Sequence, residues 1–151
     1  MQARMKNPAA IVPGALEAIQ SLIATVQQGG APAATLQLAH LRASQINGCA
    51  PCVEGGVQHA RQAGETLERL SAIAVWRESQ RFTEPERAAL ALAEAMTRLS
   101  DRADAVPDAV WEEAARHFDE RGLAGLVLWL GLVNLFNRVN VATRQVPGAA
   151  W

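Results

Sequence analysis

Apolar residues recur every three or four positions from Leu16 to the C-terminus, and no segment alternates apolar and polar residues as a half-buried strand would. The pattern therefore predicts an all-α fold. Glycine, proline and polar clusters interrupt the periodicity and divide the chain into a bundle of six or seven helices. The expected ranges are 13–28, 32–46, 50–64, 67–76, 83–100, 107–118 and 123–141.

Two local signals define helix starts within this pattern. Thr83 and Glu86 have the spacing of a capping box, in which each side chain accepts a hydrogen bond from the other residue's backbone N–H. Pro51 suits the first turn of the third helix, where its missing N–H would have no partner, and Gly48 supplies the preceding turn. Cys49 and Cys52 are therefore expected at the N-terminal end of the third helix.

The composition favours one domain over 1–151 and excludes some partners. The chain has 151 residues, of which 50% are apolar, enough to bury a core without a metal or a disulfide. Its 14 basic and 15 acidic residues are spread along the chain, so we expect no nucleic-acid partner and no anionic membrane surface. The longest uncharged stretch, 122–137, has sixteen residues, short of the roughly 20 that span a membrane. We interpret it as a buried helix or an oligomer face.

The N-terminal segment favours a cytoplasmic location. Arg4 and Lys6 are followed by Pro8 and Pro13 rather than by a long apolar run, so the segment does not resemble a secretory signal. In a reducing compartment, a Cys-x-x-Cys pair is more often catalytic, redox-sensing or metal-binding than a permanent disulfide.

The chain has two cysteines, Cys49 and Cys52, and three interpretations of them compete. A zinc site would need two further ligands, for which the histidines are His40, His59 and His117, none of them in a second paired motif. The thiols could also be inert core residues. Redox chemistry is favoured, because the unpaired N–H groups of a helix start stabilise a thiolate.

The segment 41–52, LRASQINGCAPC, resembles the signature of the carboxymuconolactone decarboxylase / alkylhydroperoxidase D-like family. Segments 60–65, 76–78 and 134–138 also match, so the resemblance covers about 13–142. It implies an all-helical fold, a homo-oligomer (trimer or hexamer) and thiol-dependent reduction of an alkyl hydroperoxide as an antioxidant activity. It also implies that Cys52 attacks the peroxide and Cys49 resolves the product. An external dithiol, for which the resemblance suggests a lipoyl group, would re-reduce the pair, and the chain itself would bind no cofactor.

The sequence departs from the family pattern at two positions. The family's relay carboxylate and histidine correspond to Gln37 and Gly56, so both acid–base groups are replaced and the activity is expected to be weak or altered. His59 is the first candidate for a relocated acid or base, although it lies roughly 10 Å from Cys52 along the helix axis. His40, three residues after Gln37, is a weaker candidate. Gly55 and Gly56 either open a cavity beside Cys52 or record the loss of an unneeded histidine.

Two other functions remain open. A redox sensor or interaction module would switch between dithiol and disulfide without turning over peroxide, and the replacements at Gln37 and Gly56 favour it. A lactone decarboxylase of the same family is less favoured, because that branch does not use a Cys-x-x-Cys pair.

Overall fold

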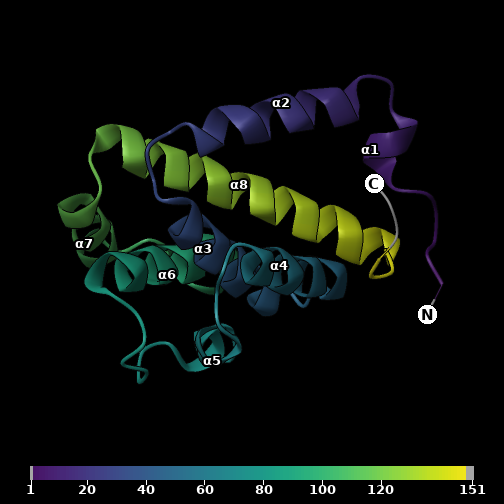
Figure 1. Ribbon diagram of the computed structural model, residues 1–151. Helices are drawn as coiled ribbons and strands as arrows, with labels where there is room; N and C mark the ends of the chain where they lie inside the picture. The colour runs from purple at the N-terminus through teal and green to yellow at the C-terminus, as the bar shows by residue number, and fades with distance from the viewer. Residues whose placement is uncertain (1, 149–151) are drawn as a thin grey trace.

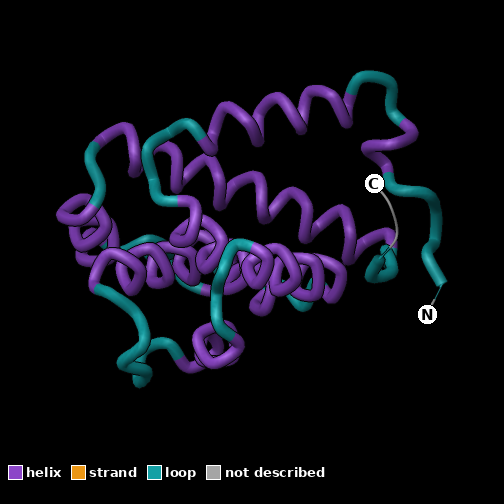
Figure 2. The backbone as a smooth tube through the Cα atoms, in the orientation of Figure 1, coloured by secondary structure: helices purple, strands orange, loops and turns teal. Residues whose placement is uncertain are grey.

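The computed structural model describes residues 2–148, and these are helical throughout apart from turns and loops (Figures 1 and 2). No strand occurs within residues 2–148, which confirms the all-α prediction. The α-helices are α1 (Pro8–Ile11), α2 (Ala15–Gln27), α3 (Ala33–Ile46), α4 (Ala50–Gln62), α5 (Leu67–Ala72), α6 (Glu84–Thr97), α7 (Asp108–His117) and α8 (Glu120–Thr143). Two 3₁₀ turns, η1 (Ile73–Val75) and η2 (Leu99–Asp101), follow α5 and α6.

The seven predicted helices correspond to α2–α8, and two differences have local causes. Helix α1 was not predicted, because a single turn is too short to show periodicity; the Asn7 side chain caps it by accepting a hydrogen bond from the Ala9 N–H. The helix predicted at 123–141 begins earlier, at Glu120, so Gly122 does not precede α8. It lies inside the first turn, where its N–H donates to the capping Asp119 Oδ1 at 2.7 Å. The predicted capping box of Thr83 and Glu86 is confirmed at the start of α6.

Helices α3 and α8 form the core. Figure 1 shows α8 running between α2 on one side and α3, α4 and α6 on the other. One buried cluster joins α3 and α6 to α7 and α8, and a second joins α3 and α6 to α4, α5 and η1. Because α3 contributes to both clusters, it is buried on two sides, and Leu38, Ala39, Leu41 and Ala43 are almost completely shielded from solvent. Its position is therefore fixed by packing on both faces.

Two glycines let the end of α2 approach α8 closely. A Cβ at Gly125 would lie 3.2 Å from the Gly29 Cα, and one at Gly29 would lie 3.0 Å from the Gly125 Cα. Side chains at either position would force the helices apart. The pair therefore fixes the C-terminal end of α2, which carries Gln27, against α8.

The buried carboxylate of Glu94 connects α6 to α3 and to the segment that follows η1. Glu94 on α6 accepts hydrogen bonds from Arg42 on α3, at 2.6 Å, and from Trp76 and Arg77 after η1, at 3.0 and 2.5 Å. Burial alone would raise the pKa of Glu94, but these three donors hold it below its ordinary value. Trp76 and Arg77 thus hold helices together.

Helix α8 is apolar both on its buried inner faces and along part of its exposed outer face. It is long and apolar enough to cross a membrane by length and composition alone, as the core helix of a globular protein can also be. Its inner faces pack on the helices around it, and its buried polar residues, among them Asn134, Asn137 and Asn140, face other elements. Its outer face carries a stripe of exposed residues at alternating spacings of four and three, defined here as the α8 stripe: Ala124, Leu128, Gly131 and Leu135.

Candidate active site at Cys49 and Cys52

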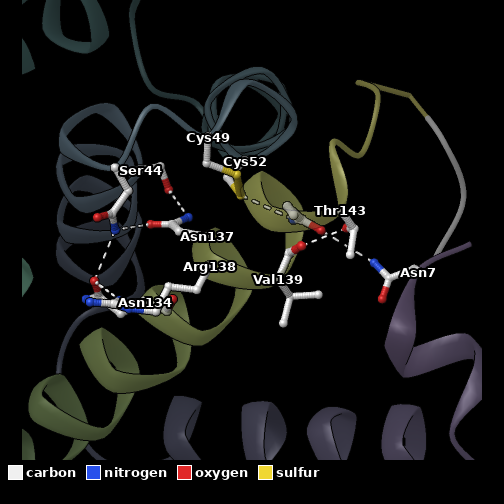
Figure 3. Close-up of a disulfide and its surroundings, with 11 residues drawn as sticks. Asn7, Ser44, Cys49, Cys52, Asn134, Asn137, Arg138, Val139 and Thr143 are labelled. Carbon is white, nitrogen blue, oxygen red and sulfur yellow. Dashed lines mark hydrogen bonds between the residues drawn. A yellow bond between two sulfur atoms is a disulfide. The ribbon is translucent and has the colours of Figure 1, made fainter. Parts of the chain in front are cut away.

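The two cysteines lie where the sequence predicts, at the start of α4. Cys49 is the N-cap residue and Cys52 lies in the first turn, with their Cα atoms 5.3 Å apart and their sulfur atoms joined in a disulfide (Figure 3). Gly48, at a φ of +65°, provides the left-handed turn that ends α3 and begins α4. Cys49 is completely buried, whereas Cys52 retains 9% of its surface.

Polar side chains attach the turn before the disulfide to α8. Asn47 donates to Asn134 Oδ1 at 3.0 Å and to Asn137 Oδ1 at 2.8 Å, and Asn137 donates to Ser44 Oγ at 3.0 Å. Figure 3 shows Ser44 and Asn137 beside the disulfide. These buried bonds satisfy polar groups inside the core and hold the end of α3 in place.

Asn140 contacts the sulfur of Cys52 directly. Its side-chain amide donates to Cys52 Sγ at 3.4 Å, and its Oδ1 accepts from Asn7 Nδ2 at 3.4 Å. The sequence analysis missed Asn140. The available signal was the spacing of Asn134, Asn137 and Asn140, which places three amides three residues apart on an otherwise apolar helix.

A cavity of about 260 Å³ opens beside Cys52. Its apolar lining is Pro51, Trp129 and Phe136, and its polar lining is Gln27, Gln37, His40, His59 and Asn140, with Cys52, Gly55 and Gly56 completing the wall. It brings together every predicted site residue except the fully buried Cys49. None of the residues lining it in the described part of the chain is a carboxylate, lysine or arginine. A wider surface depression along α4 includes neither cysteine.

The ring of His40 occupies the space that a side chain at position 56 would need. A Cβ built on Gly56 would lie 2.8 Å from His40 Cε1, 2.9 Å from His40 Nδ1 and 2.8 Å from Leu41 Cδ2. The two glycines therefore differ: Gly56 makes room for His40 and Leu41, whereas a Cβ on Gly55 would meet nothing within 4 Å. Both glycines lie in the cavity wall, but open space follows from the missing side chain only at Gly55, because His40 and Leu41 fill the space beside Gly56.

The two histidines of the cavity have different surroundings. His40 is partly buried, and its pKa is lowered from 6.5 to about 4, first by burial of the ring and then by repulsion from His59. Its ring centroid lies 6.3 Å from that of Trp129. His59 is exposed at the cavity edge. The sequence analysis placed His59 ahead of His40, but the structure seats His40 deeper in the cavity.

Gln37 lines the same cavity and carries a buried acceptor. Its Oε1 atom is shielded from solvent and has no hydrogen-bond partner among the described residues. A buried acceptor without a partner is costly, so a ligand or water that donates to it would be stabilised there.

The described residues do not form a metal cluster. Within residues 2–148, no group of three or more His, Cys, Asp or Glu side chains is close enough to hold a metal ion.

A cysteine pair at a helix start, beside a cavity in an all-helical bundle, defines the class as a helical protein with a cysteine pair that can cycle between dithiol and disulfide. The model of the carboxymuconolactone decarboxylase family matches residues 13–95. The chain belongs to this family, which confirms the resemblance that the sequence motifs indicate.

Similar proteins support this placement. The uncharacterized protein YdfG of Bacillus subtilis is 31% identical over 132 residues, covering 87% of this chain and 88% of YdfG. A crystal structure from Agrobacterium tumefaciens, described as an antioxidant-defence candidate of the AhpD type, is 33% identical with a TM-score of 0.89, covering 99% of this chain and all of that one. The debrominase Bmp8 shares the fold at 21% identity and a TM-score of 0.80, with coverage of 91% and 73%.

Proposed function

We propose that the protein is a thiol-dependent hydroperoxide reductase in which Cys52 attacks the peroxide and Cys49 resolves the product. The observation that carries this proposal is the asymmetry of the pair. Cys52 lines the cavity and accepts a hydrogen bond from Asn140, whereas Cys49 is fully buried behind it. Reactive cysteines are accessible and lie where a thiolate is stabilised, and the first turn of α4 offers both conditions to Cys52.

The reaction begins from the reduced pair. The Cys52 thiolate attacks the distal oxygen of the hydroperoxide, the O–O bond breaks, and the alkoxide takes a proton and leaves as alcohol or water. Cys52 is thereby oxidised to a sulfenic acid. The Cys49 thiol then attacks Cys52 Sγ, water leaves, and the disulfide forms.

Side chains around the cavity suit a hydroperoxide. The amide side chain of Gln37, on the cavity wall, can hydrogen-bond to a bound hydroperoxide. The aromatic rings of Trp129 and Phe136 offer a surface for the organic group.

An external dithiol must return the disulfide to its reduced form. Because Cys49 is inaccessible, the incoming thiolate attacks Cys52 Sγ through the cavity, Cys49 leaves as the thiolate, and the second thiol of the reductant closes its own disulfide. A lipoyl group on a flexible arm meets these requirements, and the chemistry needs no cofactor held by the chain.

The protein is also proposed to assemble with copies of itself through the α8 stripe. Leu128 and Leu135 are 54% and 43% exposed on the core helix, and the small Ala124 and Gly131 between and beside them allow a close approach. The variant Leu128→Glu/Leu135→Glu should lower the mass measured by light scattering to that of a smaller species, whereas Leu67→Glu, at an equally exposed leucine on α5, should not. Equal masses for all three proteins would contradict the proposed interface.

Steady-state consumption of hydroperoxide tests the proposed function. Cumene hydroperoxide and hydrogen peroxide are supplied with dihydrolipoamide to the wild type, Cys52→Ser and Cys49→Ser. We expect turnover by the wild type and a loss of at least a hundredfold in Cys52→Ser. A wild type that forms its disulfide once and does not cycle would indicate a sensor, and lactone decarboxylation that survives loss of both cysteines would indicate the decarboxylase branch.

A further inference from the structure

The imidazole ring of His40 occupies the space that a side chain at position 56 would fill. Cys52 and Gly56 are four residues apart on α4, so they share a face and their Cβ positions are roughly 5–6 Å apart. His40 Nδ1 lies 2.9 Å from the Cβ position of residue 56. The two lengths together put Nδ1 at most about 9 Å from the Cβ of Cys52. Both side chains line the same cavity, so water within it can carry a proton between the imidazole and the sulfur.

We propose that His40 carries a proton whose binding is linked to the redox state of the Cys49–Cys52 pair. His40 is neutral when the disulfide is closed and protonated when Cys52 is a thiolate. The linkage itself is a property of the dithiol and its neighbour; only its use in peroxide reduction rests on the proposed function.

The charges facing His40 favour this linkage. From α4 the titratable groups are Cys52 and His59. The other polar and aromatic residues lining the cavity carry no charge: Gln27 from α2, Gln37 from α3 itself, and Trp129, Phe136 and Asn140 from α8. In the disulfide form the cavity lining therefore offers His40 no negative partner, and the desolvated ring gives up its proton. Reduction creates a thiolate, which is a single negative charge within the same cavity and favours the imidazolium.

The proton balance of the cycle is complete. An external dithiol, R(SH)₂, supplies two electrons and two protons to the disulfide; one proton stays on Cys49 as a thiol and the other resides on His40 while Cys52 is a thiolate. When Cys52 attacks the hydroperoxide and the O–O bond breaks, the His40 imidazolium gives its proton to the alkoxide, which leaves as the alcohol. His40 is then neutral again, ready for the disulfide state.

Because His40 and Gly56 are in contact, a double variant can move the histidine from α3 to position 56 of α4. A histidine at position 56 would lie on α4 itself, one turn from Cys52, but it clashes with the ring of His40 unless that ring is removed. His40→Ala should therefore lose the linked proton, and His40→Ala/Gly56→His should recover it from the other helix.

Imidazole titration by NMR tests the linkage on the wild type, with His40 signals assigned from His40→Gln. We expect a His40 pKa near 4 in the disulfide form and a proton affinity at least tenfold higher in the dithiol form. His117, which pairs with Glu113 away from the cavity, is the internal control, and its signals should not change with the redox state of the cysteines. The same His40 titration in both redox states would overturn the proposal.

Alkylation by iodoacetamide as a function of pH gives a second readout that needs no peroxidase activity. In the reduced protein, His40→Ala should alkylate Cys52 about tenfold more slowly at neutral pH, and the double variant should regain most of that rate. Two results together would contradict the proposal. The double variant would alkylate as slowly as His40→Ala, and His40 of the wild type would titrate in the same way in both redox states. A His40 that follows redox state in a protein that consumes no hydroperoxide would retain the linkage and reject the proposed function instead.

Discussion

The side-chain amide of Asn140, on α8, donates a hydrogen bond to the sulfur of Cys52, on α4, at 3.4 Å. The two residues are 88 positions apart, so the core packing of α8 against α3 and α4 places this donor at the reactive sulfur. A donor at this position stabilises a thiolate more than a neutral thiol.

Replacing Asn140 should therefore raise the pKa of the Cys52 thiol. We expect Asn140→Ala to raise it, because a donor to the thiolate is lost, and Asn140→Asp to raise it further, because a carboxylate would repel the thiolate. The pH dependence of iodoacetamide alkylation of the reduced protein measures this value. An unchanged profile in both variants would show that the Asn140 contact does not stabilise the thiolate.

Two adjacent glycines of α4 should respond to alanine in opposite directions. Gly55→Ala adds a methyl group in open space and should stabilise the fold by about 0.5–1 kcal/mol through helix propensity. Gly56→Ala places its methyl group against His40 and Leu41 and should destabilise it by about 1–2 kcal/mol. Urea unfolding measures both, and a stabilised Gly56→Ala would mean that His40 and Leu41 do not hold this space.

The disulfide form should lose stability as the pH falls from about 6.5 to 4. The folded state holds the pKa of His40 at about 4, below the unfolded value of 6.5, so the unfolded chain takes up a proton that the folded chain does not. The contribution is complete above pH 6.5 and falls by about 2–3 kcal/mol as the pH passes down to 4. His40→Gln should flatten this part of the profile of unfolding free energy against pH, and a slope equal to that of the wild type would contradict the assignment.

Glu94 should contribute far more to stability than a surface carboxylate. Its side chain is 8% exposed and pairs with the largely buried Arg42 and the exposed Arg77, so Glu94→Gln leaves the Arg42 guanidinium without its charged partner and should cost about 3 kcal/mol. Glu113→Gln removes an exposed carboxylate paired with Arg116 and should cost less than about 1 kcal/mol. Equal losses in urea unfolding would show that Glu94 does not organise the core.

The helices could be predicted from the sequence because the features that define each one lie within a few neighbouring residues. Helical periodicity located α2–α8, and the pairing of Thr83 with Glu86 and the position of Pro51 defined two helix starts. Helix α1 has four residues, too few for a periodic signal, and the start of α8 depended on whether Asp119 or Gly122 dominated the junction.

The site could be predicted only in part because its contacts join distant segments. The motif placed Cys49 and Cys52 correctly, since both belong to one helix start. The fit of His40 against Gly56 and the bond from Asn140 to Cys52 depend on how α3 and α8 pack on α4, which no spacing within one helix reveals. For the same reason, the sequence ranks His59, on the same helix as Cys52, ahead of His40, whose approach from α3 cannot be read from spacing within α4.

The most direct measurement identifies which sulfur the hydroperoxide oxidises. Reduced Cys49→Ser is mixed with one equivalent of cumene hydroperoxide in the presence of dimedone, which traps sulfenic acids, and the adduct is located by peptide mass spectrometry; Cys52→Ser serves as the matched control. The account predicts rapid labelling at Cys52 in Cys49→Ser, far faster than a free thiol, and negligible labelling of Cys52→Ser. Equal labelling of both variants at the rate of a free thiol would contradict it.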